Sequence, residues 1–136
     1  MGADLQQLNW LAIIVAALAS YFPGAIWYSP IGFLHPWARE LGVDLGVKPK
    51  GVGRRVAIGL IPALVATIAF ALVVGPHPSL SHAVARAIVI AIGFIATSFA
   101  IQYLYENRGP AFWLINAGYH LVQFLIMGAI LALWPW

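Results

Sequence analysis

The stretch from Ala111 to Trp134, AFWLINAGYHLVQFLIMGAILALW, contains no Asp, Glu, Lys or Arg. A helix of about 20 predominantly apolar residues is long enough to cross a bilayer, so this stretch predicts a membrane span. The whole chain agrees, because 62% of its 136 residues are hydrophobic and only 8% are charged. One soluble core in so short a chain cannot bury that much apolar surface. The composition therefore excludes a soluble enzyme and a disordered tail, and the lack of cysteine excludes a secreted disulfide scaffold.

Three further apolar stretches precede this one. The predicted spans are residues 8–33, 56–74, 83–104 and 111–134. Pro30 and Gly32 close the first span, and the turn at 107–110 is so short that the spans on either side of it must be antiparallel neighbours. We therefore expect one domain, residues 1–136, of the all-α class. It is predicted to be an integral membrane four-helix bundle with up-down-up-down topology.

The first stretch also resembles the apolar region of a signal peptide between Leu11 and Ser20. A signal peptide carries Lys or Arg before that region. This chain has only Asp4 there, and its apolar run continues through Trp27. A retained membrane span is the favoured interpretation.

The positive charges predict the orientation of the bundle. Five of the seven Lys and Arg residues lie between the first two spans, at Arg39, Lys48, Lys50, Arg54 and Arg55. Positive charge in short loops marks the cytoplasmic side, so loop 34–55 is predicted to be cytoplasmic and both termini non-cytoplasmic. Within this loop, residues 36–42 predict a short interfacial helix, with Pro36 at its first position and Gly42 just past its end.

Part of the same loop is a candidate site for lipid headgroups. The residues concerned are Lys48, Lys50, Arg54 and Arg55. Clusters of Lys and Arg beside a membrane attract anionic lipid, but the same charges also serve as the positive-inside signal, which is the favoured interpretation. Because topology accounts for the charge, we expect the lipid bilayer as a partner and no nucleic acid.

Small residues and prolines predict how the helices pack. Small residues recur at Ala12, Ala16, Ser20 and Gly24 in the first span, and at Ala83, Ala87 and Ala91 in the third. Spacing of four places them on one helix face, where they allow close approach of a neighbouring helix. We expect these faces to pack the bundle and some of them to serve a homo-oligomer. Pro23 and Pro62 predict kinks within the first and second spans.

Polar residues recur at helical spacing in the last span. Asn116, His120 and Gln123 share one stripe, with Tyr119 beside it. His120 lies near the middle of the span, and an ionisable residue at that depth marks a functional site by default. Four residues of other spans are expected to face the same interior: Thr97, Gln102, Ser20 and Tyr21. These eight residues are the candidate ligand-binding residues, in a small polar chamber.

Three interpretations of His120 stay open. The favoured one is a neutral histidine that hydrogen-bonds Asn116, Gln123 or Tyr119 and holds helices together. The second is ligand contact or proton relay, and the third is axial ligation of haem or a pigment. The sequence itself requires no cofactor. No metal site is expected, and because no carboxylate lies inside a span we expect neither catalytic residues nor an enzyme.

The chain resembles a known family at its first span. The signature consists of Asn9 and the element Trp27, Tyr28, Ser29 and Pro30, of which the Trp-Tyr-Ser-Pro element is the most specific part. It is similar to the family called domain of unknown function 1761, small bacterial and fungal membrane proteins of about this length. The resemblance implies four membrane helices and carries over no activity, catalytic residue or cofactor. We expect a multi-pass protein of the bacterial inner membrane.

Two functions of different classes follow from these observations. The first is binding or transport of a small hydrophobic or weakly polar ligand by a homo-oligomer, since a polar stripe in lipid costs stability unless it is satisfied. The second is a non-catalytic accessory subunit of a larger membrane complex, in contact with pigment or lipid and with partner membrane subunits. The first is slightly favoured.

Overall fold

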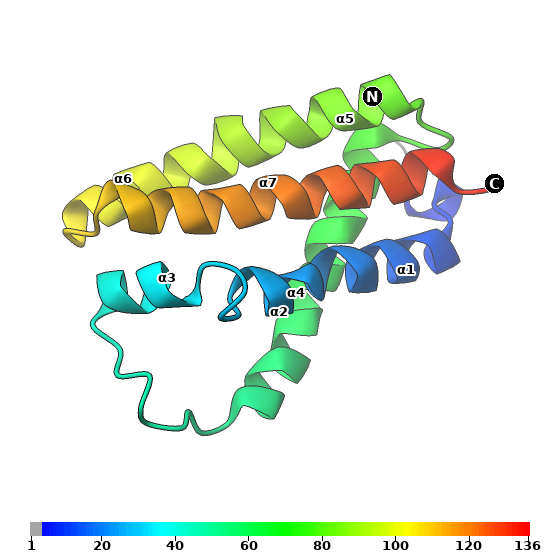
Figure 1. The fold of residues 1–136 in the computed structure, drawn as a ribbon. Coiled ribbons are helices and arrows are strands. Elements are labelled where there is room, and N and C mark those ends of the chain that lie inside the picture. Colours follow the sequence, from blue (N-terminus) through cyan, green and yellow to red (C-terminus); the bar gives the residue numbers. More distant parts are fainter. Residues whose placement is uncertain (1–3) are drawn as a thin grey trace.

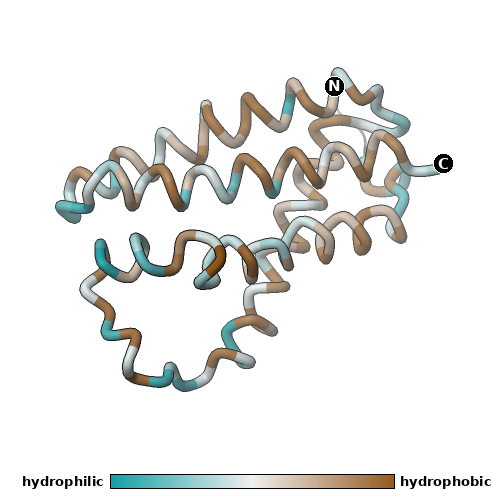
Figure 2. Tube along the Cα trace, viewed as in Figure 1, coloured by the Kyte–Doolittle hydropathy of each residue, from teal (hydrophilic) through white to brown (hydrophobic). Residues whose placement is uncertain are grey.

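The computed structural model describes residues 4–136 and is built from helices (Figure 1). Four helical segments in this part of the chain are long and apolar enough to cross a membrane: Trp10–Trp27, Val52–Val74, Leu80–Tyr105 and Pro110–Leu133. Figure 2 shows hydrophobic residues along all of the long helices and hydrophilic ones near the α6–α7 turn and between α3 and α4. The predicted all-α class with four candidate spans is confirmed.

The four spans are made of shorter elements. In chain order these are a 3-10 turn (Leu5–Gln7), α1 (Trp10–Tyr21), α2 (Pro23–Trp27), α3 (Leu34–Leu41), α4 (Val52–Val74), α5 (Leu80–Ile88), the π-helical segment η2 (Val89–Ala96), α6 (Thr97–Tyr105) and α7 (Pro110–Leu133). The third span is thus one continuous rod of α5, η2 and α6 (Figure 1). Asn107, at φ +57°, reverses the chain between α6 and α7.

Helix α7 is the central element. It packs against α5 and η2 on one side and against α1, α2 and α3 on the other (Figure 1). Half of its span is buried, whereas less than a third of each of the other three spans is. The largest fully buried apolar side chains are Ile13, Phe70, Met127 and Leu131, which come from α1, α4 and α7. The hydrophobic core therefore forms around the second half of α7.

The predicted small-residue faces are packing faces. Ala12, Ala16 and Ser20 of α1 are fully buried, as are Ala83 and Ala87 of α5. A Cβ atom added at Gly128 would lie 3.2 Å from the carbonyl oxygen of Ala83. The backbones of α5 and α7 therefore approach as closely as small residues permit.

The first span is interrupted next to Pro23, where the sequence predicts a kink. Helix α1 ends at Tyr21, and α2 begins at Pro23. The helix continues only to Trp27, so the last residues of the predicted range 8–33 form a turn rather than a span. This turn is tight, because a Cβ atom at Gly32 would overlap the carbonyl oxygens of Ile26 and Trp27.

Helix α3 begins two residues earlier than the predicted helix 36–42. It covers Leu34–Leu41 and ends at Gly42, whose φ of +71° is the left-handed geometry of a helix C-cap. It packs alongside the first half of α7 (Figure 1). Arg108 Nη1 also donates a long hydrogen bond of 3.4 Å to the carbonyl oxygen of Glu40. The predicted interfacial helix is thus part of the bundle.

The first half of α4 leans away from the bundle (Figure 1). The helix begins at Val52, four residues before the predicted range 56–74, and Pro62 lies inside it without ending it. Every residue from 52 to 58 is exposed, and the first buried residue of α4 is Ala63. Because proline has no N–H, the carbonyl of Ile58 lacks its helical donor, which loosens this turn.

Candidate functional site

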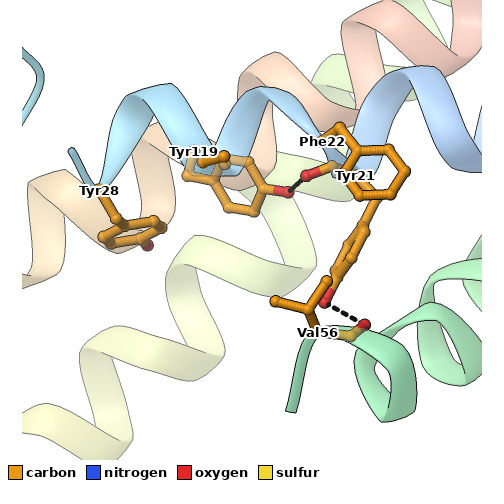
Figure 3. A pocket seen from close by; sticks show the side chains of 7 residues that line it. Tyr21, Phe22, Tyr28, Val56 and Tyr119 are labelled. Carbon is orange, nitrogen blue, oxygen red and sulfur yellow. Dashed lines mark hydrogen bonds between the residues drawn. The ribbon is translucent and has the colours of Figure 1, made fainter. Parts of the chain in front are cut away.

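Two cavities share lining residues. One lies between α1, α4, η2 and α7, and the other between α1, α2, α4 and α7. The inner cavity has a volume of about 370 Å³ and is lined by Tyr21, Gly59, Pro62, Ala63, Ala66, Ile95, Tyr119, His120, Gln123 and Phe124. The outer cavity, shown in Figure 3, has a volume of about 310 Å³ and is lined by Tyr21, Phe22, Gly24, Ala25, Tyr28, Val56 and Tyr119. Tyr21 and Tyr119 line both cavities and so lie where the two meet.

His120 and Gln123 form the polar part of the inner cavity. His120 Nδ1 lies 2.7 Å from Gln123 Oε1, one helical turn away on α7. With Oε1 as the acceptor, Nδ1 carries the proton and the ring Nε2 is an acceptor. Among the described residues, neither His120 Nε2 nor Gln123 Nε2 has a hydrogen-bond partner, and neither nitrogen is fully buried. The contact lies within one helix, so it does not itself hold two helices together.

The two tyrosines where the cavities meet are held by backbone carbonyl groups. Tyr119 Oη donates to the carbonyl oxygen of Tyr21 at 2.9 Å, and Tyr21 Oη donates to that of Val56 at 3.0 Å (Figure 3). Two glycines make room for these hydroxyls. A Cβ at Gly24 would lie 3.0 Å from Tyr119 Oη, and one at Gly59 would overlap Tyr21 Oη.

Asn116 belongs to a separate network outside the inner cavity. Its Oδ1 accepts from Tyr28 Oη at 2.7 Å, and its Nδ2 donates to Tyr103 Oη at 3.1 Å. Burial raises the pKa of the Tyr28 hydroxyl above its ordinary value, so this group keeps its proton and donates. The network joins the end of α2 to α7 and α6.

The family signature residues have structural roles. Asn9 Oδ1 accepts from Ala12 N–H at 3.1 Å and caps α1. Trp27 Nε1 donates to the carbonyl oxygen of Ile115 at 2.8 Å, beside the Tyr28–Asn116 bond. Ser29 Oγ donates to Ile26 O at 2.6 Å, at the turn that contains Pro30. These residues start the first span and attach its end to α7.

Half of the eight predicted chamber residues line the inner cavity, namely Tyr21, Tyr119, His120 and Gln123. Ser20 is buried in the helix packing, and its Oγ donates to Ala17 O. Thr97 and Gln102 are exposed, and Thr97 Oγ1 donates to Gly93 O in its own helix. The predicted chamber therefore does not extend to α6.

The π-helical segment accounts for the position of Gln102. In an uninterrupted α-helix, Gln102 would lie about three turns beyond Ala91 and share its buried face. The wider turns of η2 rotate all later residues around the axis. The other lining residues were not predicted to line a chamber: Gly59, Pro62, Ala63, Ala66, Ile95 and Phe124. The only related sequence signal is Pro62, which was predicted as a kink.

The four candidate headgroup residues lie at one end of α4. Lys48 and Lys50 precede the helix, and Arg54 and Arg55 lie in its first turns, all exposed. They do not line either cavity. Residues 4–136 contain no group of three His, Asp or Glu side chains able to hold a metal ion.

The fold and the site define a multi-pass membrane protein with four candidate spans and a partly open cavity between its helices. A family model described as Protein of unknown function (DUF1761) matches residues 11–132. The chain belongs to this family, as the first-span residues predict. Comparison with curated proteins gave no match, and comparison with solved structures gave none either.

Proposed function

We propose that the protein binds a small, mostly apolar molecule carrying one hydroxyl group in the inner cavity. The observation that supports this proposal is the His120–Gln123 pair, which has two unpartnered nitrogens in an otherwise largely apolar lining. No fully buried side-chain nitrogen or oxygen among the described residues lacks a partner, so both free nitrogens are accessible from the cavity and a ligand there can reach them. A hydrogen bond from a ligand to each of them adds about 0.5–1.5 kcal/mol.

The chemistry of the pair favours a hydroxyl group. Gln123 Nε2 can donate to the hydroxyl oxygen while His120 Nε2 accepts the hydroxyl proton. If the amide and the imidazole tautomer are both exchanged, Gln123 Oε1 becomes the acceptor and His120 Nε2 the donor. The pair therefore offers one donor and one acceptor in either state. A hydrocarbon satisfies neither group, and an ether oxygen satisfies only the donor.

Binding is proposed rather than catalysis because of what surrounds the pair. The four acidic residues, Asp4, Glu40, Asp44 and Glu106, are all absent from the inner-cavity lining. The pair therefore has no carboxylate beside it to orient or activate it for acid–base work. Transport would require Tyr21 or Tyr119 to move, since these side chains lie where the two cavities meet.

We place the protein in the bacterial inner membrane, with loop 34–55 in the cytoplasm and both termini outside it. The cationic residues of that loop support this orientation. A homo-oligomer is part of the proposal, because long apolar faces of the outer helices remain exposed. The alternative, an accessory-subunit role in a larger membrane complex, would use the same exposed faces.

Three matched probes test the proposal: 2-naphthol, naphthalene and 2-methoxynaphthalene, which carry a hydroxyl, no polar group and an ether oxygen. Their binding to the protein in nanodiscs is followed by fluorescence anisotropy, with empty nanodiscs subtracted. We expect 2-naphthol to bind roughly tenfold more tightly than either analogue, because only it satisfies both nitrogens. The preference is expected to disappear in Gln123→Leu and in His120→Ala.

Gln102→Leu is the matched control, because it removes the same amide from an exposed position outside the cavity. It is expected to keep the preference of the unmodified protein. Equal affinity for the three probes in the unmodified protein, or a full preference in Gln123→Leu, would overturn the proposal.

A further inference from the structure

A third cavity lies at the turn between α6 and α7, away from the His120–Gln123 pair. This turn cavity has a volume of about 240 Å³, and its lining includes Ala100, Tyr103, Leu104, Arg108 and Trp113. We propose that it binds the phosphate group of an anionic phospholipid through Arg108 and Tyr103. This inference is independent of the ligand proposed for the inner cavity.

Arg108 is held in place with most of its donors unused. The side chain is half-buried, and its guanidinium carbon lies 5.5 Å from the centre of the Phe112 ring. Among the described residues its only hydrogen bond is the 3.4 Å contact to Glu40 O. A guanidinium group has five N–H donors in a planar fork that matches a phosphate group. The Phe112 ring and the hydrogen bond to α3 thus position the Arg108 guanidinium, whose remaining N–H donors are free to bind an anion.

Tyr103 supplies a second donor to the turn cavity. Its Oη accepts from Asn116 Nδ2, and Asn116 in turn accepts from Tyr28 Oη. Because the Tyr103 oxygen already accepts a hydrogen bond, its own proton is available, and no described residue accepts it. The Tyr28–Asn116–Tyr103 network, which takes no part in the inner cavity, therefore ends at a residue that lines the turn cavity and keeps a free hydroxyl proton.

The surroundings favour a lipid over a free anion. Leu104 is 76% exposed and Ile101 is 62% exposed, so an apolar face of α6 continues from the cavity. In a bilayer this face lies against acyl chains, while Arg108, outside the candidate spans, lies at headgroup level. The turn cavity thus places the Arg108 guanidinium beside an apolar helix face that can contact a hydrocarbon tail. The four exposed residues Lys48, Lys50, Arg54 and Arg55 do not line it.

The carboxylate of Glu40 lies near the proposed phosphate site and provides a further test of it. A Cβ atom added at Gly109, next to Arg108, would lie 2.9 Å from Glu40 Oε2, so this carboxylate lies at the turn. Like charges repel strongly where water is scarce. Glu40→Gln keeps the backbone carbonyl that Arg108 uses and removes the negative charge, so it is expected to strengthen phosphate binding.

Native mass spectrometry of the full-length protein, released from mixed phosphatidylglycerol and phosphatidylcholine vesicles, measures which lipid it retains. We expect at least fivefold preferential retention of phosphatidylglycerol. Arg108→Gln is expected to lower that retention roughly tenfold, Tyr103→Phe to lower it two- to fivefold, and Glu40→Gln to raise it two- to fivefold. Arg39→Gln removes the same charge from an exposed position that is not among the candidate headgroup residues, and is expected to change it less than twofold.

Each other outcome overturns the inference. Equal losses in Arg39→Gln and Arg108→Gln would show a general effect of surface charge. Displacement of the lipid by millimolar inorganic phosphate would show a free-anion site instead. If Arg108→Gln does not fold, Tyr103→Phe and Glu40→Gln still decide, because unchanged retention in both contradicts the proposed contacts.

Discussion

Polar side chains inside the bundle mostly donate to backbone carbonyl groups. Thr67 donates to Ala63 O at 2.8 Å, and Trp113 donates to Ala96 O at 2.7 Å. Such bonds satisfy a polar group without a second side chain, which suits a medium that offers no water. His120 and Gln123 depart from this pattern, because each pairs with the other and keeps one free nitrogen. The proposed binding site rests on this departure.

The Tyr119 hydroxyl provides a test of these hydrogen bonds from side chains to backbone carbonyl groups. We expect Tyr119→Phe to lower the free energy of unfolding by about 0.5–1.5 kcal/mol, because it removes the 2.9 Å bond to Tyr21 O and keeps the ring. Unfolding in mixed detergent micelles, followed by circular dichroism, measures the change. Tyr105→Phe removes a hydroxyl from a residue that is 87% exposed, and should have no effect. Equal stability of the two variants would contradict this role of Tyr119.

Sequence reasoning found the polar residues but could not fully assign their partners. The spacing of Asn116, His120 and Gln123 predicts one stripe, yet Asn116 bonds tyrosines of α2 and α6 instead of lining the inner cavity. Helical periodicity specifies which residues share a face, whereas partners depend on which neighbouring helix covers each part of that face. The roles of Trp27 and Tyr28 became visible only once α2 was placed against α7.

At the scale of elements, α4 has two halves that differ in burial. The half after Pro62 contributes Thr67 and Phe70 to the interior, whereas residues 52–58 are exposed. The Tyr21 hydroxyl bonds the exposed half to α1 at Val56. Pro62 removes one helical hydrogen bond between the two halves, and the Tyr21 hydroxyl attaches the exposed half to α1.

Gly59→Ala tests this contact between α1 and α4. The added Cβ would overlap Tyr21 Oη, so we expect the variant to lose the bond to Val56 and about 1–3 kcal/mol of stability. Hydrogen exchange should become faster at the amides of residues 54–58. Gly53→Ala is the control, because a Cβ there meets nothing within 4 Å, and better helix propensity should leave α4 equally or more stable. Equal hydrogen-exchange rates at residues 54–58 in Gly59→Ala and Gly53→Ala would contradict a stabilising role of the Tyr21–Val56 hydrogen bond.

The helices themselves were largely predictable, and their local geometry was not. Composition and length predict four spans, because few other structures tolerate such apolar stretches. The π-helical segment Val89–Ala96 has no comparable sequence signal, since its residues suit an α-helix equally well. It depends on contacts with α7, such as the bond from Trp113 to Ala96 O. The docking of α3 against α7 is likewise a property of the assembled bundle.

At the scale of the whole molecule, the predicted orientation can be tested with single cysteines. The chain contains no cysteine, so Lys48→Cys and Ser81→Cys each introduce a unique thiol at an exposed position. A membrane-impermeant maleimide added to intact cells should label Ser81→Cys and spare Lys48→Cys, because loop 34–55 is predicted to be cytoplasmic. Inverted membrane vesicles should give the opposite result. Labelling of Lys48→Cys in intact cells would reverse the proposed topology.

The central position of α7 has a consequence for biosynthesis. Ribosomes release the four spans in chain order, and α7 is the last of them. Until it emerges, the faces of α1 and α5 that pack against it remain in the bilayer without their principal partner. Assembly must therefore wait for α7, which leaves the earlier spans open to contacts with other membrane proteins or quality-control proteases. A nascent chain stalled before Pro110 should for this reason be degraded faster than the finished protein.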